Sequence, residues 1–167
     1  MIMTPSSWQW ILAVILSVLV AFILASVPLP DSVRDWRPAW VALVVIYWAL
    51  AIPERVGVLT AWTIGVLFDV MQGTLLGQNG LGLAFVAYVA LLYHQRIRVF
   101  PLFQQSLFVG SLIFIYLAWM LVVYNVLGSR HYAISYLLGA CTSALLWPWI
   151  FIVLRDLRRR MVRAAAH

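Results

Sequence analysis

Long apolar segments dominate this sequence. Residues 8–27, 102–127 and 133–154 are each almost entirely apolar, and a helix crosses the hydrocarbon core of a bilayer with about 20 such residues. The chain is 65% hydrophobic and 10% charged, with a mean hydropathy of +1.01, whereas a soluble domain is about half apolar and about a quarter charged. These observations predict an integral membrane protein.

Three shorter apolar segments lie between the first and the last two long ones. Turn-forming connections such as Pro53-Glu54-Arg55 separate them, because proline lacks the donor that a helix interior needs. The pattern predicts one all-α membrane bundle over residues 1–167. Its six spans are expected at residues 8–27, 38–52, 56–71, 80–93, 102–127 and 133–154, followed by a basic tail at residues 155–167. A five-span version, with residues 38–71 as one kinked element, is the alternative.

The first apolar segment has a second interpretation, a cleaved signal peptide. Residues 1–7 contain no lysine or arginine, and the start of a signal peptide is normally basic. We therefore expect a retained helix at residues 8–27.

The arginines predict the orientation of the six spans. With the N-terminus inside, eight arginines are cytoplasmic and three are outside, and positive-inside bias prefers this arrangement. Both termini are then cytoplasmic. Arg96, Arg98, Arg155, Arg158, Arg159 and Arg160 are the residues expected to set the orientation and to meet anionic lipid.

The net charge of +6 and the pI of about 10.1 could suggest nucleic-acid binding. The excess charge, however, lies directly behind an apolar span, as in the run Arg158-Arg159-Arg160. That placement favours the membrane surface, and we expect no nucleic-acid partner.

One carboxylate, Asp69, lies inside an apolar segment between Gly65 and Gly73. Residues at i, i+4 and i+8 share one helix face, and small residues let a second helix approach closely in lipid. We expect Gly65, Asp69, Gly73 and Gly77 to form a helix-packing or partner interface. The alternative is an acid at a helix end that reaches interfacial water and binds nothing.

The glycines that follow could suggest a phosphate-binding loop. No Lys-Ser or Lys-Thr pair follows Gly73, Gly77, Gly80 and Gly82, and no strand precedes them. A short turn into a tightly packed fourth helix is the favoured interpretation. Three amides near helix ends, Gln104, Gln105 and Asn125, are predicted to bond across helices, with contact to lipid headgroups as the alternative.

Known catalytic patterns are absent from the sequence. It has no HExxH motif, no paired catalytic carboxylates and no Rossmann fingerprint, and Cys141 is its only cysteine. His94, His131 and His167 are too scattered to predict a metal site. We therefore expect no enzyme activity, no cofactor and no metal.

Two parts of the sequence have a distinctive order and spacing. The first runs from Pro53-Glu54-Arg55 through the spacing Gly65-x3-Asp69-x3-Gly73-x3-Gly77. The second is Leu146-Trp-Pro-Trp-Ile-Phe151 followed by Arg155. Together they resemble the MreD family of bacterial rod shape-determining proteins. Residues 43–48 and the pair Gln104-Gln105 are similar to the proteobacterial branch, and the likeness covers residues 38–160.

The resemblance implies a non-enzymatic scaffold subunit in the inner membrane, which supports rod shape and peptidoglycan synthesis. It implies the bitopic protein MreC as a partner, together with MreB, RodA and penicillin-binding protein 2; a homodimer is left open. The membrane helix of MreC is expected near Gly65, Asp69 and Gly73.

The family is also similar in architecture to the substrate-binding subunits of energy-coupling-factor transporters. The alternative function is therefore a membrane subunit that binds a small molecule. Handling of a lipid-linked precursor is a third class, with only the basic cytoplasmic side in its favour.

Overall fold

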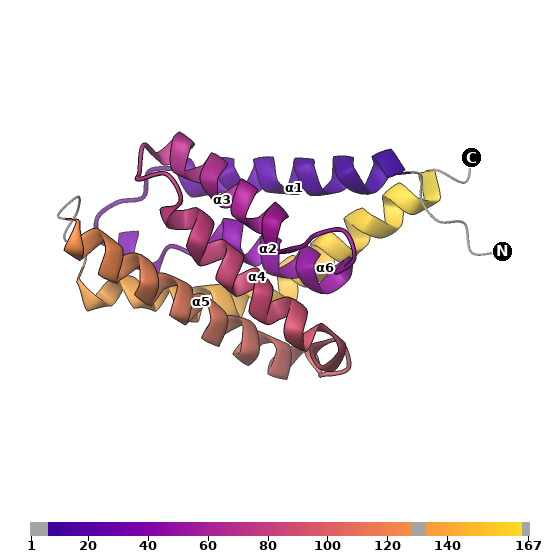
Figure 1. Ribbon diagram of the computed structural model, residues 1–167. Coiled ribbons are helices and arrows are strands. Elements are labelled where there is room, and N and C mark those ends of the chain that lie inside the picture. The colour runs from indigo at the N-terminus through magenta and orange to yellow at the C-terminus, as the bar shows by residue number, and fades with distance from the viewer. Residues whose placement is uncertain (1–6, 128–132, 165–167) are drawn as a thin grey trace.

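The computed structural model describes residues 7–127 and 133–164. These residues form six α-helices and two short 3-10 turns without a strand, which confirms the expected all-α bundle (Figure 1). The elements are α1 (Ser7–Ser26), η1 (Arg34–Trp36), α2 (Trp40–Ala51), α3 (Val58–Gln72), α4 (Gln78–Ile97), α5 (Leu102–Val126), η2 (Ile134–Leu137) and α6 (Leu138–Ala164).

Successive helices run in opposite directions, so the bundle has two ends (Figure 1). We call one of them the terminal end, because α1 begins and α6 ends there. The α2–α3 and α4–α5 connections lie at the same end. At the distal end lie the α1–α2 and α3–α4 connections. This arrangement matches the six-segment interpretation, because the five-segment version would separate the start of α1 from the end of α6.

Four helices, α1, α4, α5 and α6, are long and apolar enough to cross a membrane, so the chain is a membrane protein. The other two are shorter: α3 has 15 residues and α2 has 12. At 1.5 Å per residue α2 is about 18 Å long, well short of a hydrocarbon core of about 30 Å. The segment expected as the second span is therefore too short to cross as a straight helix.

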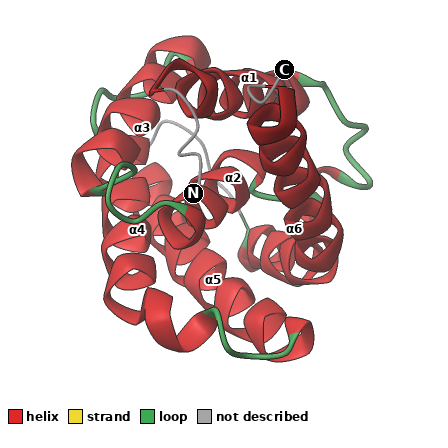
Figure 2. Ribbon diagram, turned by 90° about the vertical axis from the view of Figure 1, so that its right-hand side faces the viewer, coloured by secondary structure: helices red, strands yellow, loops and turns green. Residues whose placement is uncertain are grey.

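Helix α2 is the core of the bundle. Residues 41–50 are all buried, and Figure 2 shows α2 inside a ring formed by the other helices. The sequence explains this position, because a helix that is apolar on every side has no face suited to water. Its Trp48 indole donates to Ser17 Oγ of α1 at 2.8 Å, which pairs a polar group inside the core.

The surrounding helices carry large apolar side chains on their outward faces. Leu59 on α3 is 79% exposed and Leu145 on α6 is 81% exposed. Similar residues continue along α1, α4 and α5, for example Leu16, Ile23, Phe85, Leu92, Leu107 and Ile115. Such a surface is suited to lipid or to partner helices.

The C-terminal region differs from the expected separate tail. Helix α6 starts at Leu138, after η2, and runs without interruption to Ala164, so the arginines after residue 154 belong to the helix. Its one internal proline, Pro148, does not end it. As a result, the first arginines of the expected tail pack against the core.

Candidate functional site

The Asp69 carboxylate lies in the last turn of α3 and is 0% exposed. Its Oδ1 accepts from Thr74 Oγ1 at 2.9 Å, from the Asn79 backbone N–H at 3.0 Å and from Asn79 Nδ2 at 2.8 Å. Its Oδ2 accepts from the N–H groups of Gly77 at 2.9 Å and Gly80 at 3.4 Å. Both oxygens are therefore engaged inside the chain.

These contacts close the N-terminus of α4. The first N–H groups of a helix have no partner within it, and the helix dipole places partial positive charge there. Gly77, at the N-cap position, has no side chain with which to satisfy them. Asp69 supplies the missing acceptor from the neighbouring helix, so an acid at membrane depth is fully paired.

The same cluster reaches α5. The Tyr116 hydroxyl donates to Asn79 Oδ1, and the Trp119 indole donates to the Gln78 carbonyl at 3.2 Å. We call Asp69, Thr74, Gly77, Asn79, Gly80 and Tyr116 the Asp69 network. Sequence reasoning missed Thr74, Asn79 and Tyr116. The sequence did contain a signal, because the polar residues Thr74, Gln78 and Asn79 follow Asp69 closely.

The predicted glycine face is not continuous. Helix α3 ends at Gln72, and Gly73 follows it with φ +64. The N–H groups of Gly73 and Thr74 bond to the carbonyls of Val70 and Asp69, which is the Schellman arrangement of a helix C-terminus. Gly73 and Gly77 therefore shape the α3–α4 turn, and the i, i+8 spacing does not continue the helix face.

Gly65 lies where α3 touches α4. A Cβ at this position would be 2.5 Å from Gly80 Cα and 2.7 Å from the Asn79 carbonyl oxygen, so the two backbones are in direct contact. The face expected to receive the MreC helix is covered by the chain's own α4. A partner helix would have to displace α4 to reach it.

The three amides differ in their surroundings. Gln105 is buried, and its Nε2 donates to the carbonyls of Ile97 and Phe100 in the α4–α5 corner. Asn125 is exposed and donates to Leu121 of its own helix, and Gln104 is exposed. Of the three, Gln105 alone is shown joining separate segments.

Arginines at the terminal end hold the C-terminus of α2. Arg98 donates through Nε to the Leu50 carbonyl at 2.7 Å and through Nη2 to the Ala51 carbonyl at 2.8 Å. Arg158 on α6 donates to the same Ala51 carbonyl at 3.3 Å. Because carbonyls at a helix C-terminus lack partners within the helix, these side chains cap the buried core helix.

The remaining predicted arginines make fewer contacts. Arg155 is half-buried, with its Cζ 5.9 Å from the centre of the Phe151 ring. Arg96, Arg159 and Arg160 are exposed.

Two cavities lie at opposite ends of the bundle. The distal cavity, about 130 Å³, is beside the Asp69 network and is lined by Arg37, Asn79, Tyr116 and others. The terminal cavity, about 360 Å³, is lined by Tyr47, Leu50, Ala51, Ile97, Arg98, Gln105, Phe151, Arg155 and Arg158. Across residues 7–127 and 133–164, no group of three His, Cys, Asp or Glu is placed to hold a metal ion.

Comparison with known proteins identifies the family. The family model described as rod shape-determining protein MreD matches residues 6–157. The rod shape-determining protein MreD of Haemophilus influenzae is 34% identical over 142 residues, which cover 85% of this chain and 88% of that protein. No solved structure matches the chain, so the expected likeness to energy-coupling-factor subunits stays a prediction. The chain belongs to the MreD family of rod shape-determining proteins.

Proposed function

We propose that this protein is a non-enzymatic scaffold subunit of the bacterial inner membrane. It supports rod shape and peptidoglycan synthesis by binding MreC, and through the resulting complex it works with MreB, RodA and penicillin-binding protein 2. Membership of a rod shape-determining family over most of the chain is the observation that carries the proposal.

The surroundings of Asp69 support a structural role for this acid of α3. A carboxylate that binds a ligand or transfers protons needs an oxygen within reach of that group. Five donors surround the two oxygens of Asp69, and the side chain is fully buried. Its contacts join α3 to the turn and to α4, and Asn79 extends the network to Tyr116 on α5.

The outward apolar faces support docking of partner helices. Helices associate in lipid through close packing, since lipid tails are as apolar as leucine. The Gly65 face is occupied by α4, so we place MreC on the outer surface of the bundle. A second copy of this chain is an alternative occupant of that surface.

The distribution of arginine supports an orientation. Arg55, Arg96, Arg98 and the arginines of α6 belong to the terminal end, whereas Arg34 and Arg37 belong to the distal end. By the positive-inside rule the terminal end faces the cytoplasm. The distal end then faces the periplasm, and both termini are cytoplasmic.

The transporter-like alternative is less favoured. Pockets that enclose a small molecule usually measure about 300–1,000 Å³. The distal cavity beside the Asp69 network is smaller, at about 130 Å³. The terminal cavity, at about 360 Å³, only reaches the lower end of that range. Saturable thermal stabilisation of the purified chain by a vitamin would support the transporter function over scaffolding.

Cysteine crosslinking in cells tests the scaffold proposal. In a Cys141→Ser background, single cysteines replace one outward residue on each of five helices: Leu16, Leu67, Phe85, Ile115 and Ile152. Leu83, which is 0% exposed on α4, provides the buried control. We expect crosslinks to MreC from one contiguous group of outward positions and none from Leu83→Cys.

Two results would count against this placement. Variants that all maintain rod shape but never crosslink to MreC would contradict docking on the outer surface. Crosslinks only between copies of the chain would assign that surface to a homodimer.

A further inference from the structure

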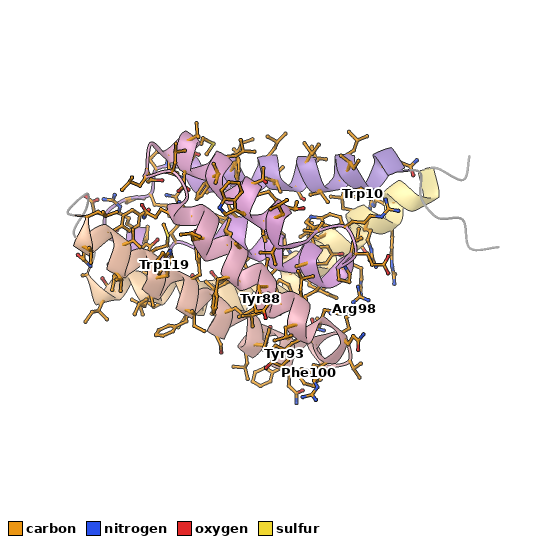
Figure 3. The ribbon with its side chains drawn as sticks, viewed as in Figure 1. Trp10, Tyr88, Tyr93, Arg98, Phe100 and Trp119 are labelled. Carbon is orange, nitrogen blue, oxygen red and sulfur yellow. The ribbon has the colours of Figure 1, made fainter. Side chains whose placement is uncertain are left out.

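The terminal cavity lies at the C-terminal end of the short core helix α2. Helix α2 stops at Ala51, whereas α6 continues past it to Ala164. The space left at the end of α2 is bounded by α6 and by the α4–α5 corner, and it measures about 360 Å³. Figure 3 shows Arg98 at this corner, together with Tyr93 and Phe100.

Three guanidinium groups line this cavity without a carboxylate to balance them. Arg98 and Arg158 cap α2, and Arg155 contacts the Phe151 ring. None of the three forms an ion pair with a described carboxylate. A helix C-terminus is equivalent to about half a negative charge, and Asp156 lies on α6 between Arg155 and Arg158, so positive charge remains in excess here. Arg155 and Arg158 are half-buried, whereas Arg98 is exposed.

Two polar atoms at this cavity also have no partner. Gln105 is 5% exposed, and its Oε1 accepts no hydrogen bond although its Nε2 makes two. The Nε of Arg155 is likewise buried and unpartnered. Buried polar groups in proteins are nearly always paired. These two atoms are enclosed by protein, so the groups that the cavity offers to a ligand are the guanidinium groups of its lining.

We propose that the terminal cavity binds the headgroup of an anionic glycerophospholipid. The phosphate lies among Arg98, Arg155 and Arg158, since planar guanidinium groups pair well with phosphate oxygens.

The surroundings of the cavity fit a lipid. Val99, which is 84% exposed, and Phe103, which is 74% exposed, lie at the same α4–α5 corner, where acyl chains can cover them. This inference goes beyond the proposed scaffold function and does not depend on MreC. It assigns Arg98, Arg155 and Arg158 to one built site, in contrast to general attraction between the surface and anionic lipid.

A titration with short-chain lipids tests the site. The full chain, purified in detergent, is titrated with dioctanoyl phosphatidylglycerol while its thermal unfolding midpoint is recorded. Dioctanoyl phosphatidylcholine, whose headgroup has no net charge, and inorganic phosphate are titrated in parallel. We expect a saturable rise in midpoint with phosphatidylglycerol and a much weaker response to the other two.

The variant Arg155→Gln shows whether the cavity is responsible. Arg155 makes no hydrogen bond in the described structure, so its replacement should leave the lipid-free midpoint nearly unchanged. We expect it to weaken phosphatidylglycerol binding about tenfold, the effect of losing one charge-assisted pair. The matched control Arg159→Gln removes the same charge from an exposed position of α6 and should weaken binding less than about threefold.

The outcomes separate the site from its alternatives. Equal weakening by both variants would overturn the proposal in favour of general surface charge. An equal response to phosphatidylcholine would overturn the requirement for an anionic headgroup. Saturation by inorganic phosphate at similar concentrations would replace the lipid with a soluble phosphate. If Arg155→Gln does not fold, Arg155→Lys, which keeps the charge but not the planar fork, should bind with intermediate affinity.

Discussion

The two ends of the bundle pair their charged side chains differently. At the distal end, one carboxylate meets five donors and its cluster leaves no unpartnered side-chain atom. At the terminal end, three arginines meet only two backbone carbonyls, and the buried Gln105 Oε1 and Arg155 Nε have no partner.

This difference assigns a structural role to the distal end and a binding role to the terminal end. A closed network contributes to stability and offers nothing to a ligand, whereas unpartnered donors beside a cavity leave binding capacity unused. Substitutions at the distal end should therefore change stability. At the terminal end, effects on stability and on binding should be separable.

The largest loss of stability is expected from Asp69→Ala. The change leaves five donors without an acceptor inside the bundle, and one unsatisfied buried donor already costs about 1–3 kcal/mol. We expect a loss of about 3 kcal/mol or more in an SDS unfolding titration. Asp69→Asn keeps one oxygen and should lose less stability. Equal stability of Asp69→Ala and wild type would contradict the network.

A smaller loss is expected where α3 touches α4. In Gly65→Ala the new Cβ would meet the Gly80 backbone at 2.5 Å, and because backbone cannot rotate away, the helices must separate at a cost of about 1–3 kcal/mol. Gly57→Ser is the control, since its Cβ meets nothing within 4 Å and serine is favoured at a helix N-cap. Similar unfolding midpoints for the two variants would refute the contact.

At the terminal end, Arg98→Gln should lower stability by about 1–2 kcal/mol. It removes hydrogen bonds to the Leu50 and Ala51 carbonyls. One bond to a charged donor contributes about 1.5–3 kcal/mol, but Arg98 is exposed and Arg158 still donates to the Ala51 carbonyl, so the loss is smaller than the sum. The loss should appear in the same SDS titration. Arg96→Gln, an exposed neighbour on the same helix end, should change stability little.

In the α3–α4 turn, Gly73→Ala should lower the free energy of unfolding by about 1 kcal/mol. The φ angle is +64 there, and a Cβ makes that conformation unfavourable. Gly73→Asn should lose less, since asparagine tolerates the left-handed region better. If alanine and asparagine destabilise equally, crowding and not the backbone angle is responsible.

The smallest expected effect on stability belongs to Arg155→Gln in lipid-free detergent, about 0.5 kcal/mol or less, because that side chain makes no hydrogen bond within the described residues. Thermal unfolding checks this value. A loss as large as that of Arg98→Gln would mean that Arg155 is part of the α2 cap.

The positions of the helices could largely be predicted from the sequence. Runs of apolar residues correspond to the six helices, and breaks such as Pro53 and the glycines after residue 72 lie between them. The central place of α2 was also encoded, because residues 41–50 are apolar on every side. The expected second span, residues 38–52, contains α2, and its full crossing of the bilayer stays a prediction because this helix has 12 residues.

The partners of buried polar groups could not be predicted. Asp69 was recognisable as an acid in an apolar helix, but Tyr116 lies on α5 and meets the network only once the bundle has packed. Arg98 resembled an ordinary arginine of a basic loop, although the end of α2 lies beside it. Such pairings depend on tertiary placement and leave no pattern along the chain.

The central claim is that the outer surface of the bundle recruits MreC while the buried polar groups serve the fold. The most direct test measures the amount of MreC that co-purifies per folded chain. Outward substitutions to tryptophan on each helix are compared with folded Asp69→Asn. We predict that substitutions on one outward face abolish capture without lowering the unfolding midpoint, and that Asp69→Asn retains it. Loss of capture in Asp69→Asn, with every outward variant unaffected, would contradict the account.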